Sequence, residues 1–245
     1  MYIDVHSHLH MPKLYSKIDR IVKNASRANV INVINCGLDI ESNRKVLELS
    51  KKYQLIKPAL GLYPTESEKM SENEIENEIE FIRSNKPFAI SEIGMDLKHL
   101  NSLNKQKPMF EKMLNLAEDL NLPVIVHTRK AELETLEILE TTDLKIILHC
   151  FTGNTNLIKK ASENGYFFSV PTSVTYMQEL QNLVQNVSIN KLMTETDAPF
   201  LAPIKGRINE PANILQGVKK IAEIKQMTEK ETTSIIFKNY KKVFK

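Results

Sequence analysis

The chain has 245 residues but only two cysteines, seven glycines and no tryptophan. Two cysteines are too few for a disulfide framework. Cys36 and Cys150 each adjoin an apolar run, so we expect two reduced, buried thiols in a cytoplasmic protein. No glycine-rich loop follows the first apolar run, which argues against a dinucleotide-binding sheet. No apolar stretch approaches the length of a membrane span and no basic-then-apolar leader opens the chain, so we expect no membrane association.

Neither sign of charge is in large excess. The net charge is +3, which is too small to indicate a nucleic-acid partner and does not exclude one. Apolar residues make up 42% and charged residues 26%, the balance of an ordinary globular protein. Barrels of this length are routinely single domains, and no linker or composition shift divides the chain. We therefore expect one domain over residues 1–245.

The dominant pattern is the alternation of two kinds of segment. Short runs rich in Val, Ile and Leu are each followed by a longer segment, and the eight runs span residues 2–6, 30–36, 55–62, 88–94, 123–127, 145–150, 166–170 and 191–196. Because the runs are continuously apolar, they indicate strands that are covered on both faces, as in a parallel sheet.

The longer segments have helical periodicity. Apolar side chains recur at helical spacing in residues 105–121, and again in residues 71–84 after a capping-box start at Ser71. Two more helices are expected near residues 210–225 and 228–241. Eight parallel strands with helices between them predict an α/β fold of the (β/α)8 TIM-barrel type. An open doubly wound sheet is the alternative.

Ionisable side chains stand at the ends of five of these runs, where such a barrel carries its chemistry. They are His6 and His8 after the first run, Glu92 in the fourth, His127 in the fifth, His149 in the sixth and Asp197 after the eighth. His6 and His8 are two residues apart, so they face the same side of a strand. Each side chain alone has an ordinary explanation, such as a core histidine, a buried acid or a helix cap. Their shared position at strand ends favours a metal site.

The number of candidate ligands indicates how many ions the site holds. Four imidazoles and two carboxylates exceed what one tetrahedral ion with an open position needs. They suit two divalent ions about 3.5–4 Å apart that share a bridging carboxylate. Glu92 lies on the middle strand, between the first pair of histidines and the second. We therefore expect Glu92 to bridge the two ions.

Seven blocks of sequence, in order, resemble the TatD-type metal-dependent deoxyribonucleases, a family of amidohydrolase-like barrels. The blocks are DVHSHLH (4–10), ALGLYP (59–64), SEIGMD (91–96), LNLPVIVHTRKA (120–131), HCFTG (149–153), ETDAPFL (195–201) and KGRINEP (205–211). The match runs almost from end to end, which makes it far more specific than a lone His-x-His. One departure is Tyr63, because the family usually has histidine at that position.

The resemblance implies a role for each matched residue. One ion would be held by His6, His8, Glu92 and Asp197, and the second by Glu92, His127 and His149. Asp197 would also be the base that positions or deprotonates the attacking water. Glu195 and Asp4 would lie behind the ligands and orient a ligand histidine. His10 and His99 fall outside the matched ligand positions, so we expect neither to bind metal.

The implied reaction is hydrolysis of a phosphodiester, as a 3′–5′ exonuclease on single-stranded DNA or on RNA, with Mg²⁺, Mn²⁺ or Zn²⁺. Contacts to the substrate phosphates are expected from Tyr63, Arg129, Lys205 and Arg207. Two alternatives stay open. The same metal pair could hydrolyse an ester or amide, such as a D-aminoacyl-tRNA or a small amide, or the protein could bind metal without catalysis. The spare acid Asp197 argues against metal binding without catalysis, because a structural site needs no base.

Overall fold

The computed structural model describes residues 1–98 and 103–244, and its strands form one eight-stranded parallel sheet. Neighbouring strands follow the chain order without a reversal. The strands are β1 Tyr2–Ser7, β2 Val30–Cys36, β3 Ile56–Leu60, β4 Ala89–Asp96, β5 Val124–Arg129, β6 Ile146–His149, β7 Phe167–Pro171 and β8 Leu192–Glu195. All eight predicted runs are strands. The uninterrupted order excludes the doubly wound alternative, in which strand order reverses at a switch point.

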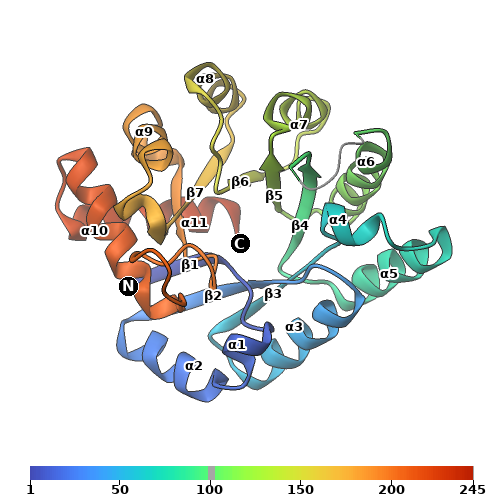
Figure 1. The fold of residues 1–245 in the computed structure, drawn as a ribbon, viewed down its shortest axis with the longest axis horizontal. Helices are drawn as coiled ribbons and strands as arrows, with labels where there is room; N and C mark the ends of the chain where they lie inside the picture. The colour runs from blue at the N-terminus through green and yellow to red at the C-terminus, as the bar shows by residue number, and fades with distance from the viewer. Residues whose placement is uncertain (99–102, 245) are drawn as a thin grey trace.

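The sheet closes into a barrel between β1 and the residues that follow β8. Ser7 forms a parallel bridge with Ala198, and the His8 amide donates to the Ala198 carbonyl at 2.7 Å. One residue earlier, the Asp197 amide donates to the His6 carbonyl at 2.9 Å. The two ends of the sheet therefore meet, and Figure 1 shows the strands around a common centre with helices outside them. The predicted (β/α)8 TIM barrel is confirmed.

Most helices lie between successive strands and pack around the sheet (Figure 1), while α10 and α11 follow the last strand. The α-helices are α1 Pro12–Tyr15, α2 Ile18–Arg27, α3 Ile40–Lys52, α4 Pro64–Ser67, α5 Glu72–Asn85, α6 Leu103–Leu120, α7 Glu132–Leu139, α8 Thr155–Glu163, α9 Gln178–Asn186, α10 Ile214–Lys225 and α11 Glu229–Val243. The 3-10 helices are η1 Thr172–Thr175, η2 Ile189–Lys191 and η3 Pro211–Asn213. No described helix has the length and apolar character that crossing a membrane requires.

Local signals explain where some of these helices begin. At α5, the Ser71 hydroxyl accepts from the Glu74 amide at 3.3 Å, and the Glu74 carboxylate accepts from the Ser71 amide at 2.8 Å. This is the predicted capping box, and α11 begins with a box of the same kind. The predicted helix at 210–225 is shorter than expected. Its start is 3-10 helical because the Asn213 amide donates to the Glu210 carbonyl, three residues back.

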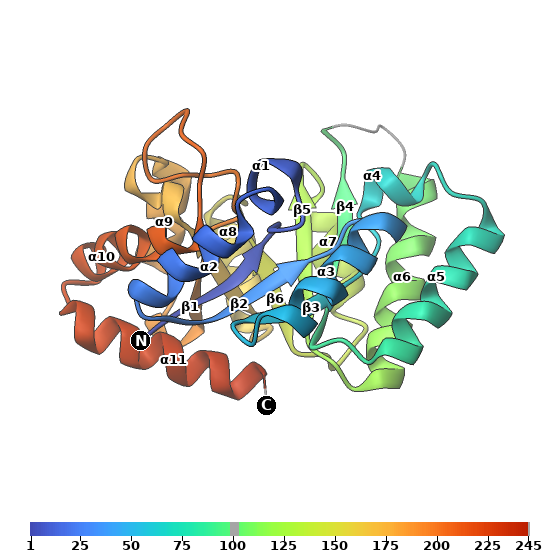
Figure 2. The ribbon, with the colours of Figure 1, turned by 90° about the horizontal axis from the view of Figure 1, so that it is seen from below.

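The two ends of the barrel are covered differently. Apolar side chains from the strands fill the interior, and Tyr240 and Val243 of α11 and Phe244 just after it are buried against them. Figure 2 shows α11 along the edge where β1 begins, with both chain termini on that side. The loops that follow the strands rise on the opposite side. The ionisable residues at the strand ends therefore face the end that α11 leaves open.

Candidate metal centre

The six side chains predicted as metal ligands converge at the open end of the barrel. They are His6 of β1, His8 just after it, Glu92 of β4, His127 of β5, His149 of β6 and Asp197 just after β8. All six are buried. Five of them line a cavity of about 490 Å³. The sixth, His6, does not line the cavity, and its Nε2 atom lies 3.1 Å from that of His8.

The register of the sheet aligns two of the histidines. Gly94 of β4, His127 of β5 and His149 of β6 lie directly opposite one another on neighbouring strands. Gly94 has a φ of 137°, and a Cβ atom there would lie 2.0 Å from the His127 carbonyl oxygen. Only glycine allows β4 to approach β5 this closely. The glycine of the SEIGMD block therefore brings the β4 carboxylate close to the β5 histidine.

The two carboxylate oxygens of Glu92 face two different pairs of imidazoles. Oε2 lies 3.4 Å from Nε2 of both His6 and His8. Oε1 lies 2.8 Å from Nδ1 of His127 and 3.8 Å from Nε2 of His149. A carboxylate that reaches two separate groups of ligands has the geometry of a bridge between two cations.

Asp197 faces one side of this arrangement only. Its Oδ1 lies 3.3 Å from His8 Nε2 and 3.7 Å from His6 Nε2. The residue is in the left-handed region with a φ of 53°, a conformation that aspartate tolerates better than most side chains. Its backbone is held on both sides, since its amide donates to the His6 carbonyl and its carbonyl accepts from the Phe200 amide at 2.8 Å. The turn after β8 thus directs the carboxylate towards the β1 histidines.

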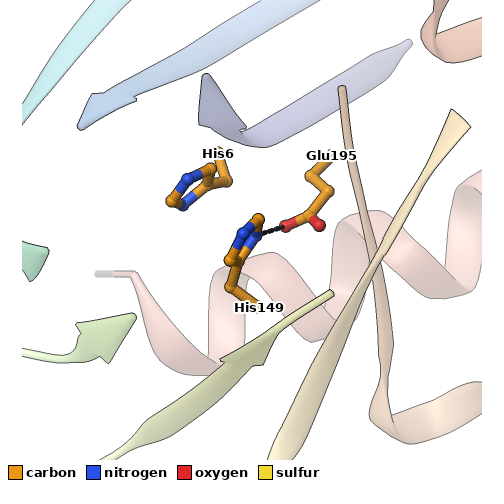
Figure 3. A group of neighbouring side chains, drawn as sticks. All are labelled: His6, His149 and Glu195. Carbon is orange, nitrogen blue, oxygen red and sulfur yellow. Dashed lines mark hydrogen bonds and ion pairs between the residues drawn. The ribbon is translucent and has the colours of Figure 1, made fainter. Parts of the chain in front are cut away.

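Three of the histidines are oriented by partners on their outer ring nitrogen. His8 Nδ1 lies 3.0 Å from the Cys36 carbonyl oxygen, and His6 Nδ1 lies 3.4 Å from the Cys36 sulfur. His149 Nδ1 lies 2.9 Å from Glu195 Oε2, and Figure 3 shows this bond between the ring and the carboxylate. In each case Nε2 is the nitrogen directed at the Glu92 carboxylate. A partner on one ring nitrogen that leaves the other for a cation is typical of histidine ligands.

His127 is oriented in the opposite sense. Its Nε2 lies 3.3 Å from Asp96 Oδ2 and 3.2 Å from the Tyr63 hydroxyl, and that hydroxyl donates to Asp96 at 2.9 Å. Its Nδ1 therefore points inward. Although Glu92 Oε1 lies 2.8 Å from this Nδ1 atom, the two do not form a hydrogen bond of normal geometry. A buried ring nitrogen without a hydrogen bond is suited to a cation.

The imidazoles keep the two carboxylates ionised. Burial acts to raise the pKa of Glu92, but His6 and His127 outweigh it and hold the pKa well below its usual range. Burial also acts to raise the pKa of Asp197, and His8 outweighs it in the same way, so this pKa is lowered. Both groups are therefore anionic near neutral pH.

The carboxylates in turn change the basicity of the histidines. Burial acts to lower the pKa of His8, but Asp197 outweighs it and raises the pKa to about 10. The pKa of His149 is raised to about 9, because Glu195 outweighs burial. His6 differs, since burial and the neighbouring His149 lower its pKa. A metal ion that binds here would displace protons from His8 and His149.

The donor set fits divalent metal ions. Among the described residues, three groups of side chains have ligand atoms within 4.8 Å of one another, namely His6–His8–Glu92, Glu92–His127–His149 and His6–His149–Glu195. The first two share Glu92 and match the two ligand sets predicted from the sequence, apart from Asp197. Neutral imidazole nitrogens and carboxylate oxygens suit zinc and manganese, and carboxylates also suit magnesium.

The two acids expected behind the ligands have different contacts. Glu195 accepts from His149 and from the Ser169 hydroxyl, so it contacts a predicted ligand as expected. Asp4 contacts no imidazole ring in any hydrogen bond of the described chain. Its carboxylate accepts from the Thr196 amide at 2.8 Å and the Thr196 hydroxyl at 2.6 Å. Asp4 therefore joins β1 to the residue that follows β8, and the same carboxylate accepts from the His6 backbone amide at 3.4 Å.

The residues expected to contact the substrate fall into two groups. Tyr63 and Arg129 line the cavity. Lys205 and Arg207 do not line it, and they are exposed on the loop after β8. The structure therefore places only the first two next to the predicted metal ligands.

Three further predictions concern residues outside the ligand set. His10 is buried but belongs to none of the three ligand groups, and His99 lies outside the described residues. Cys36 and Cys150 are both free thiols, as expected. The expectation that both are buried was wrong for Cys150, which is partly exposed because it lines the cavity.

Asp96 and Cys36 contact predicted ligands although none of the sequence patterns above predicts it. Asp96 is four residues after Glu92 on the same strand, and this even spacing is the signal that could have placed both on one face. Cys36 acts partly through its backbone carbonyl, which no residue type reveals.

Comparison with known proteins identifies the family. The sequence model described as TatD related DNase matches residues 3–245. The chain belongs to the TatD-related DNase family. The uncharacterized metal-dependent hydrolase MJ1582 of Methanocaldococcus jannaschii is 35% identical over 100% of this chain and 97% of that protein. Human deoxyribonuclease TATDN3 is 28% identical over 99% of this chain and 94% of that protein.

A solved structure supports the same assignment. The crystal structure of YJJV, a TatD homologue from Escherichia coli, superposes with a TM-score of 0.90 at 25% identity. It covers 99% of this chain and 97% of that one. The resemblance to the TatD family drawn from the seven blocks is confirmed. Together with the clustered His and Glu side chains, membership of the family makes this chain a metal-dependent hydrolase.

Proposed function

We propose that this chain is a single-domain deoxyribonuclease that uses two metal ions to hydrolyse phosphodiester bonds at the 3′ end of single-stranded DNA. The observation that carries the proposal is the position of Glu92, whose two oxygens face the His6–His8 pair and the His127–His149 pair. One ion would be held by His6, His8, Glu92 and Asp197, and the other by Glu92, His127 and His149.

Two divalent ions bound here would polarise the phosphate, activate a water molecule and stabilise the leaving oxygen. The protein supplies the base. Asp197 lines the cavity, and its lowered pKa keeps it ionised, so its carboxylate can accept a proton from the attacking water. Glu195 holds the His149 ring through Nδ1, which keeps Nε2 of that ring directed inward.

Contacts within the cavity favour a phosphate ester. Arg129 is exposed beside the cavity, and its guanidinium can donate two parallel hydrogen bonds to phosphate oxygens. Tyr63 lines the cavity as well, and its hydroxyl, which now donates to Asp96, could turn to donate to a phosphate oxygen instead. Burial raises the pKa of this hydroxyl, which keeps it a donor. The name of the human relative TATDN3, a deoxyribonuclease, agrees with this choice of substrate. Two free thiols also fit the reducing cytoplasm, which we propose as the location of the protein.

The test is a substrate panel with defined metals. The metal-free protein is incubated with single-stranded DNA labelled at its 5′ end, with RNA of the same sequence and with a D-aminoacyl-tRNA. Mg²⁺, Mn²⁺ or Zn²⁺ is then added. We expect the DNA to shorten one nucleotide at a time from its 3′ end, and no cleavage in chelator. Release of the amino acid with intact DNA would overturn the nuclease proposal in favour of ester hydrolysis.

Metal content is measured on the same preparation. Elemental analysis at saturation should find two ions per chain. A maximum of one ion would contradict the bridging role of Glu92.

A further inference from the structure

The cavity has a charged floor and an apolar wall. The floor is made by the predicted metal ligands and the wall by Met11, Leu38, Met177, Phe200 and Leu201. Its volume of about 490 Å³ lies in the range of pockets that hold a small organic ligand. A phosphate ion alone would use only the floor. The wall indicates that the group attached to the phosphate is itself apolar over part of its surface.

Phe200 is the part of the wall whose position relative to the ligands is best defined. It is three residues after Asp197, and its amide donates to the Asp197 carbonyl at 2.8 Å. Its ring centre lies 6.5 Å from that of His8, and 48% of the residue is exposed. A flat aromatic ring is therefore held next to the charged floor with nearly half of its surface in solvent.

Phe200 belongs to a larger group of exposed apolar side chains, which we call the apolar rim: Tyr176, Phe200, Ile204 and Ile208. These side chains lie on two loops, after β7 and after β8. The loops are joined, because the Thr175 hydroxyl donates to the Pro203 carbonyl at 2.7 Å. Of the four, Phe200 lines the cavity. Exposed apolar side chains are ordinary when scattered, but an exposed aromatic ring that lines a cavity indicates a binding surface.

The charges around the apolar rim identify the kind of ligand. Lys205 and Arg207 lie between Ile204 and Ile208 on the same loop, and Arg129 lines the cavity. Across residues 1–98 and 103–244, none of these three cations takes part in an ion pair. An exposed aromatic ring, Phe200, and cations that make no ion pair suit single-stranded nucleic acid, whose bases stack on rings and whose phosphates pair with cations.

We propose that one unpaired nucleobase of the substrate stacks on the ring of Phe200 while its phosphodiester lies on the floor of the cavity. This inference rests on the proposed function and adds the group that the enzyme recognises beyond the phosphate. Stacking on a single ring tolerates any base, because every base has a flat π-face. The enzyme should therefore require a base at one position without selecting its sequence.

The experiment compares oligonucleotides with and without that base. Single-stranded DNA is made with one abasic residue, placed in turn at each of the last three nucleotides. The readout is the ratio of kcat/KM for the intact strand to that for the abasic strand. For the wild-type protein we expect a ratio of about ten or more at one of the positions.

Two variants test whether Phe200 is responsible. Phe200→Leu keeps an apolar side chain but removes the π-face, so the ratio should fall towards one. Phe200→Trp provides a larger face and should keep the ratio. Phe237→Leu is the matched control, since it makes the same change on α11 at the other end of the barrel and should leave the wild-type ratio intact.

The outcomes separate this inference from the function on which it rests. An equal ratio in wild type and Phe200→Leu at every position would overturn the stacking role and leave the nuclease proposal standing. A wild-type protein that cuts no oligonucleotide would overturn both. Thermal unfolding of Phe200→Leu is measured alongside, to show that the variant is folded.

Discussion

The two ends of the barrel are built on the same eight strands but bury opposite kinds of side chain. At the end where the strands begin, Tyr240 and Val243 of α11 and Phe244 just after it cover the interior, and Phe88 stacks on Phe244 with ring centres 5.3 Å apart. At the end where the strands finish, four imidazoles and two carboxylates are buried around a cavity. Burial of apolar surface stabilises the fold, whereas burial of charged groups opposes it unless they are paired.

This difference shows that stability and chemistry are divided between the two ends. The covered end can be damaged without touching a metal ligand. The open end brings together charges that a bound cation would compensate, so its residues should matter more for activity than for folding. Four substitutions, in order of decreasing expected effect, and one matched control test this division.

The largest effect is expected from Asp197→Asn at the open end. The amide has the same shape but cannot accept the proton of the attacking water, so kcat should fall by about a thousandfold. Single-turnover assays on single-stranded DNA measure the loss. The thermal unfolding midpoint of the metal-free protein should fall slightly, because the lowered pKa of Asp197 means that the folded state stabilises its carboxylate. Activity within tenfold of the wild type would show that another group is the base.

Glu92→Gln tests the bridge. A neutral amide is a poorer ligand for two cations, so the number of bound ions should fall from two to one or none, as measured by elemental analysis after gel filtration. Activity should fall with it.

Glu78→Gln is the matched control for this change. Glu78 is also a buried glutamate, but on α5, where it pairs with Arg44 and Asn43. Its loss should lower stability and leave the metal content at two ions. If both variants keep two ions, Glu92 is not the bridge.

Tyr240→Ala tests the covered end. The buried ring packs near Phe88 and Phe244, and its removal should lower the free energy of unfolding by about 3 kcal/mol. Urea denaturation measures this change. The kcat per folded molecule should stay at the wild-type value, and a parallel loss of kcat under conditions where the protein is folded would contradict the division between the two ends.

The smallest effect is expected from Tyr63→Phe. This change removes the hydroxyl that donates to Asp96 and lies 3.2 Å from His127 Nε2, and leaves the ring in place. One hydrogen bond contributes about 1 kcal/mol, so kcat/KM should fall by roughly fivefold. Metal content should not change. A loss as large as that of Asp197→Asn would mean that the hydroxyl takes part in the reaction itself.

The strands and the predicted ligands could be read from the sequence because both depend on local patterns. Continuous apolar runs indicate buried parallel strands, and the ends of those runs share one edge of a barrel. His127 and His149 were identified in this way, each as the polar residue that ends an apolar run. The predicted start of helix α10 was less accurate. The hydrogen bond there joins residues three apart, and it depends on how the preceding loop returns to the sheet.

Other parts of the centre depend on contacts between distant segments. The Cys36 carbonyl holds His8 because β1 pairs with β2, and the sequence of neither strand indicates this bond. Asp4 was expected to orient a ligand histidine. Barrel closure places its carboxylate against Thr196, and it contacts His6 through the backbone amide and not through the ring. The position of Phe200 beside His8 depends on the turn after β8.

By itself, the sequence determined the order of strands and helices and the identity of the candidate ligands, because side-chain periodicity and strand ends are properties of short segments. Only the tertiary structure decided which nitrogen of each imidazole points inward and how Glu92 faces two histidine pairs. Those choices depend on strand register and on closure of the barrel. Register and closure are set by packing across the whole chain, so no short segment contains them.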